Sequence, residues 1–443
     1  MPFLSPHVHS FAFKLLLAAA LVALGDLLFY QWQLSYGWLG LYTAAVLAAL
    51  LLARPAVRRD RRALAAWSAG MLYAAAMVWD ANPLAFALFL IAAGLATLLP
   101  GTTRRDDGWR WFQRLVVHGL RTPFGPLIDL AKLHRTRRHR PAGRLSLRKV
   151  LPTLALPLAG TALFAALFAS ANPVIEEFIV TLALPQLDGS TFGRMVLWSL
   201  LGLLAWGLLR PRRARRLLPA LGGDGTRALP GVSPVSVLLS LVLFNLLFAV
   251  QNTMDLAWLW GLLPLPEGMT LAQYAHRGAY PLIATALLAA LFVLVTLRPG
   301  AATAQVPAIR RLVLLWIGQN VVLVASSMLR TLDYIDAYSL TRLRIAALAW
   351  MGLVAVGLVL IGWRLVKART GAWLINANLA AATGLLTVYA FVDTGAIAAQ
   401  WNVRHAREVD GSGAVLDLCY LAELGPSALL ALVELEQRPL DPM

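Results

Sequence analysis

Residues 192–216, FGRMVLWSLLGLLAWGLLRPRRARR, decide the fold of this chain. The first part, 192–209, carries one charged residue, Arg194. It is long enough to cross the roughly 30 Å hydrocarbon core of a bilayer as a helix. Five arginines follow within the next seven residues. Because basic residues collect in the cytoplasmic loops of membrane proteins, this stretch predicts a transmembrane helix that ends inside the cell.

The rest of the chain repeats this pattern. Hydrophobic residues make up 59% of the 443 residues, charged residues only 14%, and the mean hydropathy is +0.68. Spans are expected at 11–31, 36–53, 63–79, 83–99, 150–170, 192–209, 234–251, 279–297, 312–329, 346–363 and 373–392. None shows the alternation of a barrel strand, and a backbone in lipid must satisfy its own hydrogen bonds. We therefore expect an all-α, polytopic transmembrane helix bundle of about eleven spans.

The distribution of basic residues predicts the orientation. With the N-terminus inside, 31 of the 39 lysines and arginines fall in the inner segments, whereas most acids fall outside. The C-terminal tail is then expected outside. The pI of about 10.9 therefore indicates topology and contact with anionic headgroups on the cytoplasmic side. It does not indicate nucleic-acid binding, which would need base-stacking aromatic residues among the cations of a solvated domain.

Four regions follow from this reading. We expect a four-span bundle over 1–100, a basic cytoplasmic segment over 101–149, a domain of about seven spans over 150–392 and an outer helical tail over 393–443. The stretch GWRWFQRLVVHGLRTPFGPLIDLAKLHR, residues 108–135, opens with the pattern of an amphipathic helix that lies in the membrane interface. The arginines expected to contact anionic lipid there are Arg110, Arg114, Arg121, Arg135, Arg137 and Arg138.

Common catalytic signatures are absent from the sequence. It contains no HExxH, no GxSxG and no phosphate-binding Gly-Lys loop. The one cysteine, Cys419, cannot form an internal disulfide, and we expect no metal site and no cofactor. Asp26 is the only acid inside an expected span, which makes it a functional candidate because an uncompensated charge is costly there. Its place near the outer end of the span, within reach of water, weakens that interpretation.

A polar constellation is predicted at the outer membrane boundary. Tyr274 and Arg277 precede one span, and a second set lies between two spans, at Arg330, Asp333, Tyr334, Asp336, Tyr338, Arg342 and Arg344. On a helix, Arg330, Asp333 and Tyr334 would share one face. Arginine offers a planar fork for carboxylate or phosphate, and tyrosine a hydroxyl at headgroup depth. The set is either a structural clasp between spans or a pocket or docking face for an anion, headgroup or partner.

The same residues carry a resemblance to a known family. YAHRGAYPLI (274–283), LRTLDYIDAYSLTRLRIAALAW (329–350) and WNVRHAREVDGSGAVLDLCYLAEL (401–424) resemble, in this order, three signatures of a bacterial integral-membrane family. That family is catalogued as domain of unknown function forty-one seventy-three, and the resemblance covers about 150–443. The chain departs from its pattern at His276, Ala279 and Ser339. Matching tail positions, expected as further contacts, are Asn402, Arg404, Asp417 and Tyr420.

The resemblance implies a multi-pass protein of the bacterial inner membrane and supplies no activity. We expect a non-enzymatic sensing, regulatory or assembly component that acts through the outer Tyr/Arg/Asp network, with membrane lipids and a membrane-protein partner as its contacts. A transporter or flippase for a lipid or amphiphilic anion is the alternative. An enzyme acting on a lipid-linked substrate, with Asp333 or Asp336 as base, is the least expected of the three.

Overall fold

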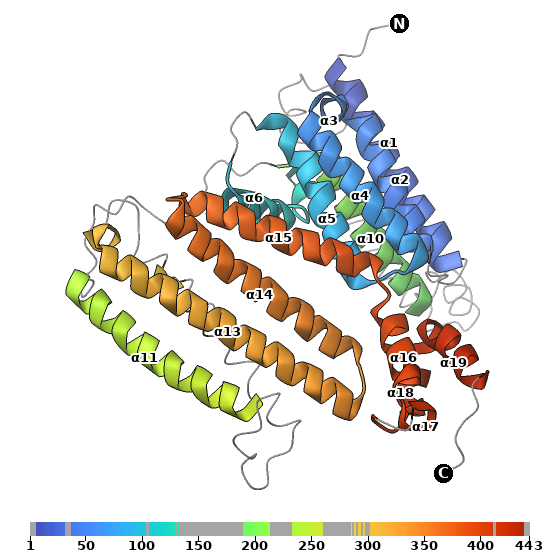
Figure 1. Cartoon of the computed structure of the whole chain (residues 1–443). Coiled ribbons are helices and arrows are strands. Elements are labelled where there is room, and N and C mark those ends of the chain that lie inside the picture. Colours follow the sequence, from blue (N-terminus) through green and yellow to red (C-terminus); the bar gives the residue numbers. More distant parts are fainter. Residues whose placement is uncertain are drawn as a thin grey trace, which may run out of the picture. The chain divides into compact units, whose positions relative to one another are not determined.

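The computed structural model describes residues 6–31, 37–102, 106–126, 128–129, 132, 189–212, 233–259, 285, 288, 291–293, 296, 302–410 and 413–437. All elements over these residues are helical, as expected (Figure 1). The chain folds into two compact units. Unit 1 consists of 1–102 with 115–214, and unit 2 of 103–114 with 215–443.

Unit 1 contains a bundle of long apolar helices. These are α1 (Pro6–Asp26), α2 (Trp38–Ala53), α4 (Arg61–Trp79), α5 (Pro83–Leu98) and α10 (Gly189–Leu209), with the short elements η1 (Leu27–Gln31), α3 (Pro55–Arg59) and η2 (Leu99–Gly101). α4 packs against α2 and α5, and α1 against α10. Leu47, Leu50 and Met77 are fully buried between α2 and α4. At Gly40 a Cβ would lie 2.4 Å from the Val78 nitrogen, so only glycine allows α2 and α4 to approach this closely.

The described part of unit 2 contains four long helices and a group of short ones. The long helices are α11 (Pro234–Leu259), α13 (Pro307–Tyr338), α14 (Arg342–Val366) and α15 (Gly371–Phe391). The short element η3 (Ala302–Gln305) lies between α11 and α13 in the chain. α15 is followed by α16 (Thr394–Arg404), α17 (Arg407–Asp410), α18 (Leu418–Leu424), η4 (Gly425–Ala428) and α19 (Leu429–Glu436). The core of the long helices centres on Trp316, whose indole contacts Phe244, Phe248 and Phe292.

α11 and α13 lie side by side and run in the same direction (Figure 1). Asn245 donates to the Leu312 carbonyl (3.1 Å) and Asn252 to the Gln319 carbonyl (3.1 Å), so both helices advance together. Amide side chains in apolar helices are expensive to bury unless they bond to a neighbour, and these bonds fix which faces meet. The predicted topology has the spans at 234–251 and 312–329 both running from the inside to the outside, so it also requires α11 and α13 to be parallel.

α6 (Gly108–Arg121) is the amphipathic helix expected in the basic segment. Its residues up to Arg114 belong to unit 2, where the Gly108 nitrogen donates to Asn376 Oδ1 of α15 at 2.7 Å. The apolar side chains of Phe112, Val116 and Leu120, four residues apart, are largely exposed. A protein-facing helix would bury such a stripe, so its exposure agrees with the expected interfacial position.

The expected spans can be compared with the described helices. Nine of the eleven coincide with α1, α2, α4, α5, α10, α11, α13, α14 and α15. The span at 150–170 and most of that at 279–297 lie outside the described residues. Within the described part, eight helical segments have the length and hydropathy to cross a bilayer, one of them the interrupted stretch Leu418–Glu436, which makes this a multi-pass membrane protein. The number of spans and the sides of the termini stay predictions, as do the four region boundaries.

The helix at the expected span 312–329 is longer than the span itself. α13 continues as helix to Tyr338, so Arg330, Asp333 and Tyr334 lie on one helix, and only Ser339–Thr341 form the turn. LRTLDYIDAY contains no proline or glycine to end the helix, and polarity alone does not stop one once the chain leaves the hydrocarbon.

Candidate functional site

The tail clasp is the first of two candidate sites, and it contains Arg342 and Arg344 of the predicted outer constellation. We use the name for Arg342, Arg344, Asn402, Tyr420 and Ser427, which tie the turn between α13 and α14 to the C-terminal helices. The side chain of buried Asn402 makes two hydrogen bonds to the backbone of Leu340. The Leu340 nitrogen donates to Asn402 Oδ1 (2.6 Å), and Asn402 Nδ2 donates to the Leu340 carbonyl (2.9 Å). This pairing satisfies two backbone groups that would otherwise be buried without partners.

Both arginines of the tail clasp are engaged. Arg344 Nη1 donates to the Tyr338 carbonyl (2.6 Å) and to the Ser339 carbonyl, and its guanidinium lies 4.1 Å from the centre of the Tyr334 ring. Ser339 has φ +71°, a value that costs a non-glycine residue energy and is kept only where neighbours hold it. The backbone nitrogen of Arg342 donates to Tyr420 Oη (2.9 Å), and its side-chain Nη2 donates to Ser427 Oγ (3.1 Å).

The other predicted tail residues also have structural contacts. Arg404 pairs with Glu434 at 3.1 Å, which joins α16 to α19. Asp417 caps α18 by accepting from the Tyr420 nitrogen at 2.9 Å. Arg342, Arg344 and the tail residues therefore tie helices together, and binding of an anion, headgroup or partner by the constellation stays a prediction.

Arg330 and the two aspartates of α13 occupy different surroundings. Arg330 is buried and donates to Asp255 Oδ2 of α11 at 2.8 Å, and Ser326 donates to the same oxygen at 3.3 Å. Asp333 and Asp336 are exposed. Asp336 lines a cavity of about 220 Å³ together with Asn402 and His405. Tyr274 and Arg277 lie outside the described residues, so the structure does not place them.

Asp26 is neutralised by a partner that sequence reasoning did not assign. Its carboxylate accepts from Arg194 Nε (2.7 Å), from Arg194 Nη2 and from Trp198 Nε1 (2.8 Å). The Arg194 guanidinium also lies 4.9 Å from the Tyr30 ring centre. A paired, aromatically covered acid is a structural joint between α1 and α10, and the functional interpretation of Asp26 loses its basis.

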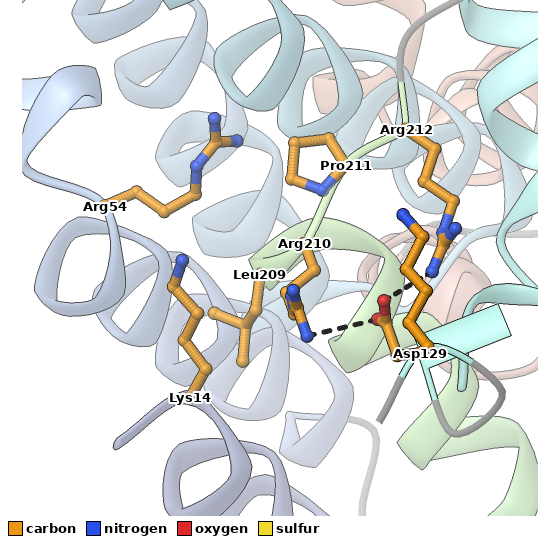
Figure 2. Close-up of a pocket in the computed structure, with 8 residues that line it drawn as sticks. Lys14, Arg54, Asp129, Leu209, Arg210, Pro211 and Arg212 are labelled. Carbon is orange, nitrogen blue, oxygen red and sulfur yellow. Dashed lines mark ion pairs between the residues drawn. The ribbon is translucent and has the colours of Figure 1, made fainter. Parts of the chain in front are cut away.

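The second candidate site is a cationic pocket in unit 1 (Figure 2). It is a cavity of about 440 Å³. Five cations line it, with one carboxylate and two apolar residues: Lys14, Arg54, Lys132, Arg210, Arg212, Asp129, Leu209 and Pro211. Among the described residues that line the pocket, the positive charges exceed the negative one by four.

The ends of three helices bring these residues together. Lys14 lies in the N-terminal half of α1, eight residues after its first residue. Arg54 follows the last residue of α2, and Arg210 and Arg212 follow the last residue of α10. In the predicted topology α1 begins inside while α2 and α10 end inside, so all three ends belong to the inner side. Cations at the C-terminal ends of α2 and α10 are also favoured by the helix dipoles.

Asp129 organises one wall of the pocket. Arg212 Nη2 lies 2.7 Å from Asp129 Oδ1 and Arg210 Nη1 3.3 Å from Oδ2, as the dashed lines in Figure 2 mark. Trp206 Nε1 donates to the same carboxylate at 3.0 Å, and Arg212 also donates to the Gly125 carbonyl at 2.9 Å. Asp129 is 9% exposed, so this carboxylate is an internal counter-ion rather than a surface charge.

The opposite wall of the pocket is basic. Arg54 Nη1 donates to the Thr97 carbonyl at 2.6 Å, a contact that orients the guanidinium. Lys14 lies close enough to Arg54 and Arg210 for their charges to act on it. Figure 2 shows Lys14 and Arg54 together on one side of Leu209, with the Asp129 pairs on the other. Like charges gathered around one cavity favour an anion from outside.

Sequence reasoning assigned these cations to the inner side but did not bring them together. Each was treated as a topological charge of its own loop. The sequence contained a signal for the pocket. The expected spans 11–31, 36–53 and 192–209 each carry a cation at their predicted inner end, either within the apolar run or just beyond it. Asp129 was the residue without a signal, since one acid in a basic segment looks like an ordinary surface residue.

The predicted lipid-contacting arginines of α6 are partly engaged. Arg114 Nη2 lies 2.6 Å from Asp106 Oδ2, and Arg110 Nη1 lies 3.2 Å from Asp106 Oδ1. Burial raises the pKa of Asp106, but the hydrogen bonds from Arg114 and Arg110 outweigh it and leave this pKa below its ordinary value. Arg121 is exposed. Arg135, Arg137 and Arg138 lie outside the described residues.

Among the described residues, no three histidine, cysteine, aspartate or glutamate side chains come together to hold a metal ion.

Comparison with known proteins shows the family. No curated protein and no solved structure matches the chain. A family model described as a domain of unknown function (DUF4153) matches residues 66–435. The resemblance drawn from the sequence named domain of unknown function forty-one seventy-three, which is a different family of the same kind, because motifs of a few residues cannot separate two such families. Since the match covers most of its length, the chain belongs to the family described as a domain of unknown function (DUF4153).

Proposed function

We propose that this protein is a non-enzymatic component of the bacterial inner membrane that binds a phosphate-bearing anion in the cationic pocket, on the cytoplasmic side. The observation that carries the proposal is the excess of cations around one cavity, five against a single carboxylate. The tail clasp supports the other part of the proposal, a regulatory or assembly role, because it couples the C-terminal helices to α13 and α14.

The side chains of the pocket suit phosphate chemistry. Arg54, Arg210 and Arg212 offer planar forks that match two oxygens at once, whereas Lys14 and Lys132 act as point charges. An anion with one or two negative charges would still leave the pocket positive, so a phosphate can enter without displacing Asp129. The phosphate could belong to a lipid headgroup or to a soluble molecule, and the experiment below separates these sources.

The pocket also bears on the second candidate, a transporter or flippase for an amphiphilic anion, because the same cations would select its substrate. Flux of a labelled anionic lipid across proteoliposomes distinguishes the two functions. A binding component retains the anion and moves none.

Lys14→Gln is the sharpest test of the proposed function. Lys14 has no hydrogen bond or ion pair in the described part of the structure, so its replacement changes charge more than packing. Binding is measured by native mass spectrometry and by the shift in melting temperature, with phosphatidylglycerol in nanodiscs as one probe and pyrophosphate in solution as the other. One cation near a membrane contributes on the order of 1 kcal/mol, so affinity should fall about fivefold.

Two further variants complete the experiment. Arg58→Gln removes an exposed cation of α3, on the same predicted side but outside the pocket, and should leave affinity unchanged. Asp129→Asn removes the internal counter-ion and should tighten binding by a similar factor. Equal losses for Lys14→Gln and Arg58→Gln would reduce the pocket to general surface attraction, and binding of neither probe by the wild-type protein would reject the proposed function.

A further inference from the structure

The last apolar stretch of the chain, Leu418–Glu436, has the length and hydropathy of a membrane span but not its geometry. Gly425 adopts φ +59° and Pro426 follows it, so the helix ends at Leu424 and restarts at Leu429 after the turn η4. α18 has 7 residues and α19 has 8. At about 1.5 Å per residue, neither reaches half of the roughly 30 Å hydrocarbon core.

The three pieces pack together instead of extending in line. α18, η4 and α19 all contact α16, and Figure 1 shows them as a compact group. Their shared core consists of small and branched side chains from both partners, with Ala398, Ala399 and Val403 of α16 against Leu421, Leu424, Ala428 and Ala431. Alanines at the contact allow short helices to approach closely, which stabilises a folded-back arrangement over a straight one.

One face of α19 is largely exposed. Leu429 is 60% exposed, Leu430 76% and Val433 51%. These positions follow one another at i, i+1 and i+4, so they share a side of the helix. Leu418 of α18 is also 60% exposed. A cluster of large aliphatic side chains at this exposure is uncommon on a surface that faces water.

The position of the cluster in the chain identifies what covers this face. α16 begins at Thr394, three residues after the membrane helix α15 ends at Phe391, so α16–α19 lie at the membrane boundary. Apolar exposure continues across that junction through Phe391, Ile397 and Trp401. Tryptophan at this depth is typical of the interfacial belt of membrane proteins.

We propose that α18 and α19 form a monotopic element: they fold back on α16 and insert the Leu429–Leu430–Val433 face into one leaflet without crossing the bilayer. The occupant of this face is lipid. By the predicted sidedness the leaflet is the outer one. The insertion is driven by apolar burial and not by headgroup charge, because the exposed charged residues of α18 and α19 are the acids Glu423 and Glu436.

Depth-dependent quenching tests the proposal on the full-length protein. Cys419 is the only cysteine, so Cys419→Ser gives a background for single probes. Leu430→Cys in that background is labelled with an environment-sensitive fluorophore and placed in phosphatidylcholine nanodiscs that carry a spin label either near the headgroup or deep in the acyl chains. The shallow label should quench the fluorophore several-fold more strongly than the deep one.

The matched control is Glu423→Cys, an exposed polar position of α18, which should report water and little quenching. Val433→Cys serves as a second apolar probe in case Leu430→Cys does not fold. Stronger quenching by the deep label would show a spanning helix. Fluorescence at positions 430 and 433 that equals the Glu423 control would show a water-facing surface open to a protein partner. Either result overturns the proposal, and neither depends on anion binding in the cationic pocket.

Discussion

The cationic pocket and the tail clasp both gather arginines near the ends of helices, but they treat the charge differently. In the tail clasp, Arg344 is held by two carbonyls and a tyrosine ring, and Arg342 by a tyrosine and a serine. In the cationic pocket, the described lining residues include five cations and one carboxylate, and that carboxylate pairs with Arg210 and Arg212. The comparison teaches that residue type alone does not separate the proposed binding site from a structural joint, so the surroundings of each cation have to be compared.

The largest expected effect comes from breaking the buried ion pair between Arg330 and Asp255. Asp255→Ala leaves the buried guanidinium of Arg330 without its carboxylate. Removing one partner of a buried ion pair costs about 3–5 kcal/mol, so the melting temperature in detergent should fall by several degrees. Asp333→Ala, which removes an exposed carboxylate of α13, is the control and should change little. If both variants lose the same stability, unit 2 does not depend on its paired arginines.

A smaller loss is expected at the tail clasp itself. Asn402→Ala removes both bonds to Leu340 and leaves its buried backbone groups unpaired, at a cost of about 2–4 kcal/mol. Hydrogen exchange should rise first in the turn 339–341 and in α16. Tyr420→Phe removes one acceptor, that of the Arg342 nitrogen, and should cost about 1 kcal/mol. The reverse order of these two losses would contradict the central place given to Asn402.

The smallest expected effect is a pH dependence of stability caused by His118, whose pKa is influenced by Arg54 of the cationic pocket. His118 of α6 has a lowered pKa, first because it is buried and second because the positive charge of Arg54 acts on it. In the unfolded chain His118 takes up a proton near pH 6.5, whereas in the native state it takes up the proton only at lower pH. The free energy of unfolding should therefore fall as pH decreases through about 6.5.

Melting temperatures measured between about pH 7.5 and pH 5.5 check this expectation. His118→Gln should flatten the dependence, and Arg54→Gln should weaken it in part by removing the second cause. An unchanged slope in His118→Gln would assign the pH dependence to other groups.

The sequence predicted helices better than it predicted their partners. Long apolar runs predicted nine of the described helices, because a membrane span is recognised from the length and hydropathy of one continuous segment. The span expected at 312–329 ended too early, because its bounds followed hydropathy and nothing in 330–338 breaks a helix. Arg330 meeting Asp255, and Asp129 meeting two arginines, depend on which helices pack together, and no local pattern encodes that.

The turn at Gly425 has a consequence for experiments on topology. An algorithm that counts apolar segments would score 418–436 as one more crossing and thereby exchange the two compartments for everything downstream. With the chain folded back on α16, a reporter fused after α19 emerges in the same compartment as α16. Alkaline phosphatase or green fluorescent protein placed there would then report whether the number of crossings up to α15 is odd or even. The backbone conformation of Gly425, which ends α18, therefore decides whether 418–436 is included in that number.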